Sequence, residues 1–175
     1  MDLMQYEQIE EEHKDDIAKV MRYLWILWWL GFSSLPVLVI MSFIIGGRLQ
    51  QQTEGTDLPF EIIIPVFCVI AAGSQIAAVV LRNLFLSGKM DNYLKRTQKF
   101  NSGKDPDHVV LCRNGLYIPA VVSSVPAFMG FPLFVMGVTP WLFYTFVILG
   151  AAGMIYHRPQ KDLIVEYIFN EQNTH

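Results

Sequence analysis

The chain has 175 residues, of which 53% are hydrophobic and 17% charged, with a formal net charge of −3 and a mean hydropathy of +0.34. Membrane-spanning helices of about 20 residues, joined by short connections, would use this whole length, so we expect no separate soluble domain. The net charge itself is unremarkable, but its distribution along the chain is informative.

Residues 1–22 are predicted to form an acidic cytoplasmic helix. They carry seven acidic and three basic residues, the reverse of a signal peptide, so we expect them to stay in the mature protein. An anionic lipid surface would repel this segment. We therefore expect it to dock on a partner protein or on the chain's own basic loop. A weak apolar stripe recurs along it at three- and four-residue spacing: Tyr6, Ile9, His13, Ile17, Val20 and Leu24.

Two uncharged segments, residues 23–47 and 62–81, have the length of transmembrane helices and are joined by a polar outer loop, residues 48–61. The first begins with three tryptophans, Trp25, Trp28 and Trp29. We expect them to anchor the helix at the membrane interface, with ligand or cofactor stacking as the alternative. Pro36 is expected to kink this helix.

The centre of the second segment is rich in small residues. The pairs Gly73/Ala77 and Ser74/Ala78 have the small-xxx-small spacing that permits close helix approach in lipid. Gln75 is the most polar side chain in any predicted span, so it should bond to a neighbouring helix. The alternative is that Gln75 lines a polar pathway.

Residues 82–113 form a basic cytoplasmic loop with seven Lys and Arg against three acidic residues. We expect this charge to set the topology and to contact anionic headgroups rather than nucleic acid. A short surface helix is predicted over 90–100, and the Asp105-Pro106 pair is typical of a new helix start.

The longest uncharged run, residues 114–156, has 43 residues and would reach about 65 Å as one helix, roughly twice the bilayer core. It must fold back, and we place the outer turn at 137–140, between spans 114–136 and 141–156. Gly suits the end of one helix and Pro the first turn of the next. Trp141 should anchor the fourth span at the interface.

Three prolines fall within 114–136: Pro119, Pro126 and Pro132. They predict a helix that is bent or locally unwound and packed inside the bundle, where its freed carbonyls find partners. Small residues on both of these spans are candidates for close helix contact, namely Ser123, Ser124, Ala127, Gly150 and Gly153.

The tail, residues 157–175, is predicted to contain a short amphipathic helix and to fray beyond Asn170. With both termini and the basic loop inside, twelve Lys and Arg face the cytoplasm and one faces outward. The fold predicted is therefore an all-α integral membrane protein with four transmembrane helices in two hairpins and cytoplasmic termini. A bacterial cytoplasmic (inner) membrane is the expected location.

The run from Ser124 to Gly130 resembles the ion-binding helix of rotary-ATPase proteolipid (c) subunits. Pro126, Ala127 and Gly130 match that family's pattern, whereas Ser124 stands in place of its carboxylate and Met129 in place of its Tyr. Without the carboxylate the resemblance implies no rotor function, but a hairpin built for tight side-by-side helix packing.

No motif for catalysis is present, and we expect no catalytic residue, cofactor or metal. Glu10-x-x-His13 has the spacing of a di-iron half-site but lacks the second motif and the further carboxylates that such a bundle site needs. His108 and His157 lie at predicted cytoplasmic boundaries. Haem or quinone ligation by them is the redox alternative.

Three functions remain for this sequence. The first is a non-enzymatic accessory or scaffold subunit that contacts the lipid bilayer and other membrane proteins or further copies of itself. The second is a transport or channel component with a polar path at Gln75, Ser74, Ser123 and Ser124. The third is a membrane redox subunit that uses boundary histidines. We expect no nucleic-acid partner.

Overall fold

The computed structural model describes residues 3–49, 59–87 and 107–174. The sequence-based expectations for the centre of the outer loop, the surface helix over 90–100 and the helix start at Asp105-Pro106 lie outside these residues. The described part of the chain is all-helical, as predicted, and its elements are α1 (Leu3–Glu12), α2 (Lys14–Leu49), α3 (Phe60–Leu86), α5 (Asp107–Val135), α6 (Pro140–Tyr156) and α7 (Lys161–Thr174).

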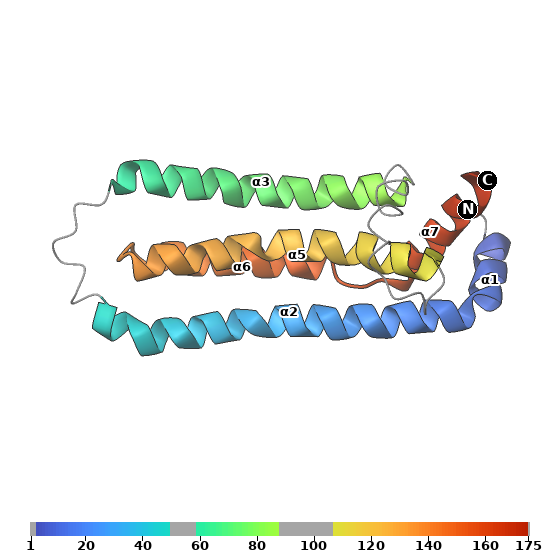
Figure 1. Cartoon of the computed structure of the whole chain (residues 1–175), viewed down its shortest axis with the longest axis horizontal. Helices are drawn as coiled ribbons and strands as arrows, with labels where there is room; N and C mark the ends of the chain where they lie inside the picture. The colour runs from blue at the N-terminus through green and yellow to red at the C-terminus, as the bar shows by residue number, and fades with distance from the viewer. Residues whose placement is uncertain (1–2, 50–58, 88–106, 175) are drawn as a thin grey trace.

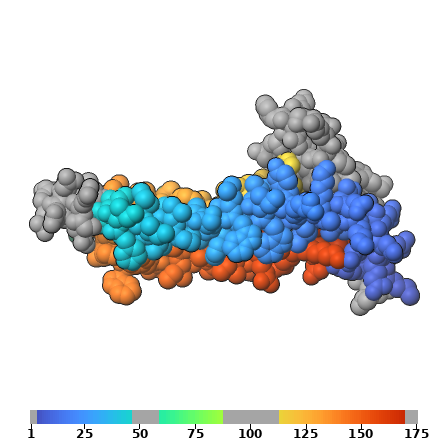
Figure 2. Space-filling view, turned by 90° about the horizontal axis from the view of Figure 1, so that it is seen from below, coloured from blue at the N-terminus to red at the C-terminus, as the bar shows by residue number. Residues whose placement is uncertain are grey.

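Helix α5 is the centre of the bundle. Helices α2, α3 and α6 all pack against it, while α2 and α3 flank it on opposite sides and have little contact with each other (Figure 1). Accordingly, 44% of the apolar window of α5 is buried, against 17% for α3 and 11% for α2. The other sides of α2 and α3 expose large apolar side chains, and α2 lies open along one face of the molecule (Figure 2).

Three helices are long and apolar enough to cross a membrane, over Lys14–Gly46, Phe60–Leu86 and Arg113–Val135. Helix α6 has 17 residues and qualifies only together with α7, from which it is bent by 54°. The chain therefore has three to four candidate spans, which fits a multi-pass membrane protein.

The prolines do not unwind α5. The helix runs without interruption from Asp107 to Val135 through all three of them, so local unwinding is excluded as an expectation. Pro119 and Pro126 are fully buried against neighbouring helices. The expected position of this helix inside the bundle is therefore right, because neighbouring helices enclose the part of the chain where a proline removes a backbone donor.

The tight turn between α5 and α6 has the chemistry that the sequence indicates. Gly137 adopts a positive φ of 85°, and its N–H donates to the Phe134 carbonyl, while the Val138 N–H donates to the Leu133 carbonyl. These two bonds form a Schellman motif. Pro140 then opens α6, where a missing N–H costs nothing.

Both marked chain ends lie at one end of the bundle, where α1 docks on α7 (Figure 1). Glu10 forms an ion pair with Lys161, and the Tyr6 hydroxyl donates to Asp162 at 2.8 Å. The apolar stripe of residues 1–24 is buried here against the apolar face of α7. The described contact of the acidic segment is thus with the C-terminal helix, not with the basic loop, whose centre lies outside the described residues.

The tail helix also differs from its prediction in two ways. Its apolar face is covered by protein, and Tyr167 stacks on Phe85 of α3 with ring centroids 4.6 Å apart. The helix continues to Thr174 instead of fraying after Asn170. Packing on α1, α2, α3 and α5 accounts for this order, because docking ties down a chain terminus.

Candidate functional site

Three helices meet at Gln75, the polar residue singled out in the sequence. From α3, its Nε2 donates to the Ser123 carbonyl of α5 at 2.7 Å. Its Oε1 would lie 2.5 Å from a Cβ added to Gly153 of α6, so the amide rests directly on that glycine. The side chain thus links two helices by a hydrogen bond and a third by close packing.

The serines proposed with Gln75 for a polar path bond within their own helices. The hydroxyls of Ser74, Ser123 and Ser124 each donate to the carbonyl three residues earlier, at 2.8, 2.7 and 2.7 Å. Ser123 is completely buried and Ser124 nearly so. The structure brings Gln75 and Ser123 together and leaves the other two hydroxyls bonded locally.

The small residues divide between contact and open faces. A Cβ added to Gly150 of α6 would stand 2.8 Å from the Ala127 Cβ of α5, so these two helices approach closely there. Gly73, in contrast, has nothing within 4 Å of an added Cβ. Helical periodicity explains this, because Gly73 and Ala77 share the face opposite to the one with which α3 packs on α5.

The tryptophans do not act alike. Trp28 is buried between helices, with 8% of its surface exposed, and its indole Nε1 donates to the Met154 carbonyl of α6 at 2.9 Å. Its expected role as an interfacial anchor is therefore corrected to an interhelical one. Trp25 is half-buried against it, edge to face, with centroids 5.5 Å apart. Trp29 and Trp141 project outward, as anchors would.

A second polar centre lies where α6 ends. The last four carbonyls of a helix lack intrahelical partners, and in α6 all four have others. Two accept from the backbone N–H groups of residues 157–158, and Met154 accepts from Trp28. The Tyr156 carbonyl accepts from Arg82 Nη1 at 3.2 Å, and that guanidinium stands 5.1 Å from the Tyr156 ring centroid. Side chains of α2 and α3 thereby hold the bend between α6 and α7.

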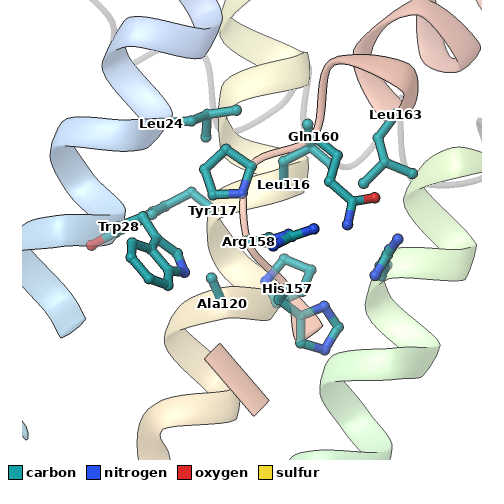
Figure 3. Close-up of a pocket in the computed structure, with 12 residues that line it drawn as sticks. Leu24, Trp28, Leu116, Tyr117, Ala120, His157, Arg158, Gln160 and Leu163 are labelled. Atoms are coloured by element: carbon teal, nitrogen blue, oxygen red, sulfur yellow. The ribbon is translucent and has the colours of Figure 1, made fainter. Parts of the chain in front are cut away.

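A small cavity of about 20 Å³ lies beside this bend (Figure 3). His157, in the connection between α6 and α7 and outside both helices, is 7% exposed, and its Nδ1 has no hydrogen-bond partner among the described residues. Burial, and then the nearby Arg82 charge, lower the pKa of His157 to about 4, so the imidazole is neutral at pH 7. The cavity is lined by Leu24, Trp28, Arg82, Leu116, Tyr117, Pro119, Ala120, His157, Arg158, Pro159, Gln160 and Leu163.

The described residues contain no group of three or more His, Cys, Asp and Glu that could hold a metal ion. In the Glu10-x-x-His13 pair, Glu10 is bonded to Lys161. The side chain of His108 lies outside the described residues, while His157 faces the cavity at the bend.

Sequence reasoning missed this cavity, although two signals pointed toward it. Arg82 and Arg158 are the first charged residues after two long apolar segments, and Pro159 interrupts the chain beside His157. No protein-family model, curated protein or solved structure matches the chain.

Proposed function

We propose that this chain is a non-enzymatic accessory or scaffold subunit of a larger membrane assembly, with four spans, both termini in the cytoplasm and a location in the bacterial inner membrane. The observation that carries the proposal is the junction of Gln75, Ser123 and Gly153. A side chain that would have to face a pathway in a transporter is instead committed to holding three helices together.

Two further features support this proposal. The candidate serines donate within their own helices, which argues against the alternative of a continuous polar path. In addition, α2 and α3 each present a long apolar side away from α5. Lipid covers such a surface in a bilayer, and the helices of a partner could replace lipid there, because close packing drives helix association in membranes.

The test is the native mass of the protein after gentle detergent extraction from its source membrane, with co-migrating proteins identified. A particle much larger than 20.0 kDa that contains defined companions is the expected result. A monodisperse particle of this chain alone would overturn the accessory-subunit proposal.

Gln75→Leu separates the scaffold from the transport alternative, with Ser74→Ala as the matched control on the same helix. For a scaffold, Gln75→Leu weakens helix packing and lowers the yield of the assembly, while Ser74→Ala changes neither. Reconstituted liposomes should show no solute or ion flux with any of the three proteins. A flux that Gln75→Leu abolishes would favour transport.

A further inference from the structure

We propose that the cavity at the bend between α6 and α7 binds the phosphate group of an anionic amphiphile, a phospholipid headgroup at the membrane surface. This inference does not depend on the accessory-subunit proposal. It rests on the side chains that line the cavity, on the unpaired nitrogen inside it, and on its place in the bundle.

The first step is charge. Arg82 and Arg158 both line the cavity, and no acidic residue among the described ones does. Arg82 donates Nη1 to the Tyr156 carbonyl, which fixes its guanidinium at the cavity while other N–H groups of the fork remain. Arg158 is exposed. Asp162, the next acidic residue along the chain, already accepts the Tyr6 hydroxyl. The cavity therefore presents positive charge.

The second step is the buried imidazole. A nitrogen shut away from water and left without a partner is unfavourable, by about 1–3 kcal/mol for a typical polar group. His157 Nδ1 is such an atom, in a side chain that is 93% buried according to its 7% exposure and that belongs to the cavity wall. A phosphate oxygen would accept from this nitrogen when it carries a proton. The enclosed volume of about 20 Å³ suits one oxygen, with the rest of the group at the mouth beside Arg158.

The third step is the shape and place of the site. The remaining wall is largely apolar, from Leu24 and Trp28 on α2 to Leu116 and Ala120 on α5 (Figure 3). The site lies where the apolar length of α6 ends and polar contacts between the chain termini begin. An apolar wall next to two arginines fits a phosphodiester that carries acyl chains better than a free phosphate ion, since basic pockets at the ends of transmembrane helices suit headgroups.

The test uses the detergent-purified full chain and native mass spectrometry with phosphatidylglycerol, phosphatidylcholine and inorganic phosphate as probes. Phosphatidylglycerol should bind more tightly than phosphatidylcholine. Arg158→Gln should weaken its binding about fivefold, the effect of one arginine near an anionic headgroup. Arg22→Gln is the matched control, because Arg22 is exposed, precedes the same end of α2 and does not line the cavity. It should leave the affinity within about twofold.

The outcomes separate cleanly. If inorganic phosphate competes at millimolar concentration, the phosphate site is supported and its source is a soluble ion; if it does not compete, the source is the lipid. Equal binding of the two lipids, or equal effects of Arg158→Gln and Arg22→Gln, would overturn the proposal. Because Arg158 is exposed, its variant should unfold at the wild-type temperature, which excludes misfolding as the cause.

An independent readout is pH. A bound anion favours the imidazolium, so phosphatidylglycerol should bind more tightly at pH 5 than at pH 7 in the wild type and equally in His157→Gln. The other ionisable groups at the cavity are Arg82 from α3, Arg158 from the connection and Tyr117 from α5, while α2 and α7 contribute apolar side chains. None of these three changes charge between pH 5 and 7 at its ordinary pKa. A pH dependence that persists in His157→Gln would remove the imidazole from the site.

Discussion

The contact between Gly153 and Gln75 predicts that Gly153→Ala destabilises the bundle. The added Cβ would stand 2.5 Å from Gln75 Oε1 and 2.9 Å from the Ser123 Cβ, whereas ordinary contact begins at 3.4 Å. The amide can swing aside, but the Ser123 Cβ is fixed to the backbone of α5. Helices α5 and α6 must therefore separate by about half an ångström at their most closely packed level.

The magnitude follows from a matched pair of substitutions. Overpacking by one methyl group costs about 1–3 kcal/mol, while replacing Gly with Ala in a helix gains up to about 1 kcal/mol. Gly73→Ala has the same gain without the overpacking, because nothing lies within 4 Å of its added Cβ. The difference in the free energy of unfolding between the two variants should thus be about 1–3 kcal/mol, whatever helix propensity contributes in detergent.

The assay is equilibrium unfolding in detergent micelles, followed by helical circular dichroism, for the wild type and both variants. A double-mutant cycle adds a sharper criterion: Gly153→Ala should be less damaging by about 0.5–1 kcal/mol when Gln75 is already Ala, since one of its two obstacles is gone. If Gly153→Ala is as harmless as Gly73→Ala, the three-helix junction does not exist as described.

Three further predictions concern the end of the bundle where the termini meet. Trp28→Phe should lower the free energy of unfolding by about 1 kcal/mol through the lost bond to the end of α6, whereas Trp29→Phe, which is exposed, should change it by under about 0.5 kcal/mol; an equal effect would contradict the interhelical role. Because the folded pKa of His157 is about 4 and the ordinary value is 6.5, the unfolded chain binds more protons between these values, so stability should fall by up to about 3 kcal/mol as pH drops from 6.5 to 4 and His157→Gln should flatten that part of the profile. Tyr6→Phe removes an exposed bond between the terminal helices and should cost under about 1 kcal/mol in thermal unfolding, with a larger loss indicating that the contact is more protected than it is here.

The helices and the outer turn follow from the sequence because their signals are local. An uncharged run too long for one crossing demands a fold-back, and Gly137 and Pro140 are the residue types that end one helix and begin another. The structure has a Schellman motif at the first and a helix start at the second. Such signals lie within a few residues of the feature that they specify.

The faces of the helices could not be predicted in the same way. The segment 62–81 is apolar on all sides, so no hydrophobic stripe marks which side packs on α5 and which meets lipid. The small pair Gly73/Ala77 suggested one face, but the face of Ala71 and Ala78 is the buried one. Trp28 presents the same difficulty, because an indole that anchors at an interface and one that donates across helices occur in the same local sequence.

The contact between the terminal helices was out of reach for another reason. Tyr6 and Asp162 are 156 residues apart, and either charged segment could equally have met the basic loop. What decides is apolar burial: the stripe on residues 1–24 needs a partner of equal length, and α7 provides one in Ile164, Val165 and Ile168. Exposed ion pairs such as Glu10–Lys161 then select the register more than they stabilise it.

These contacts make the two ends of the bundle different. At one end, α1, α2, α3, α5 and α7 share an apolar cluster around Phe85 and Tyr167, and side chains from α2 and α3 cap the last carbonyls of α6. Along the rest of its length the bundle is held by α5, which alone contacts all of the other long helices closely. Partner helices would therefore displace lipid from the open sides of α2 and α3 without disturbing α5, whereas a change at the bend between α6 and α7 would reach five helices at once. We accordingly expect substitutions on the outer faces of α2 and α3 to alter assembly, and substitutions at the bend to alter stability.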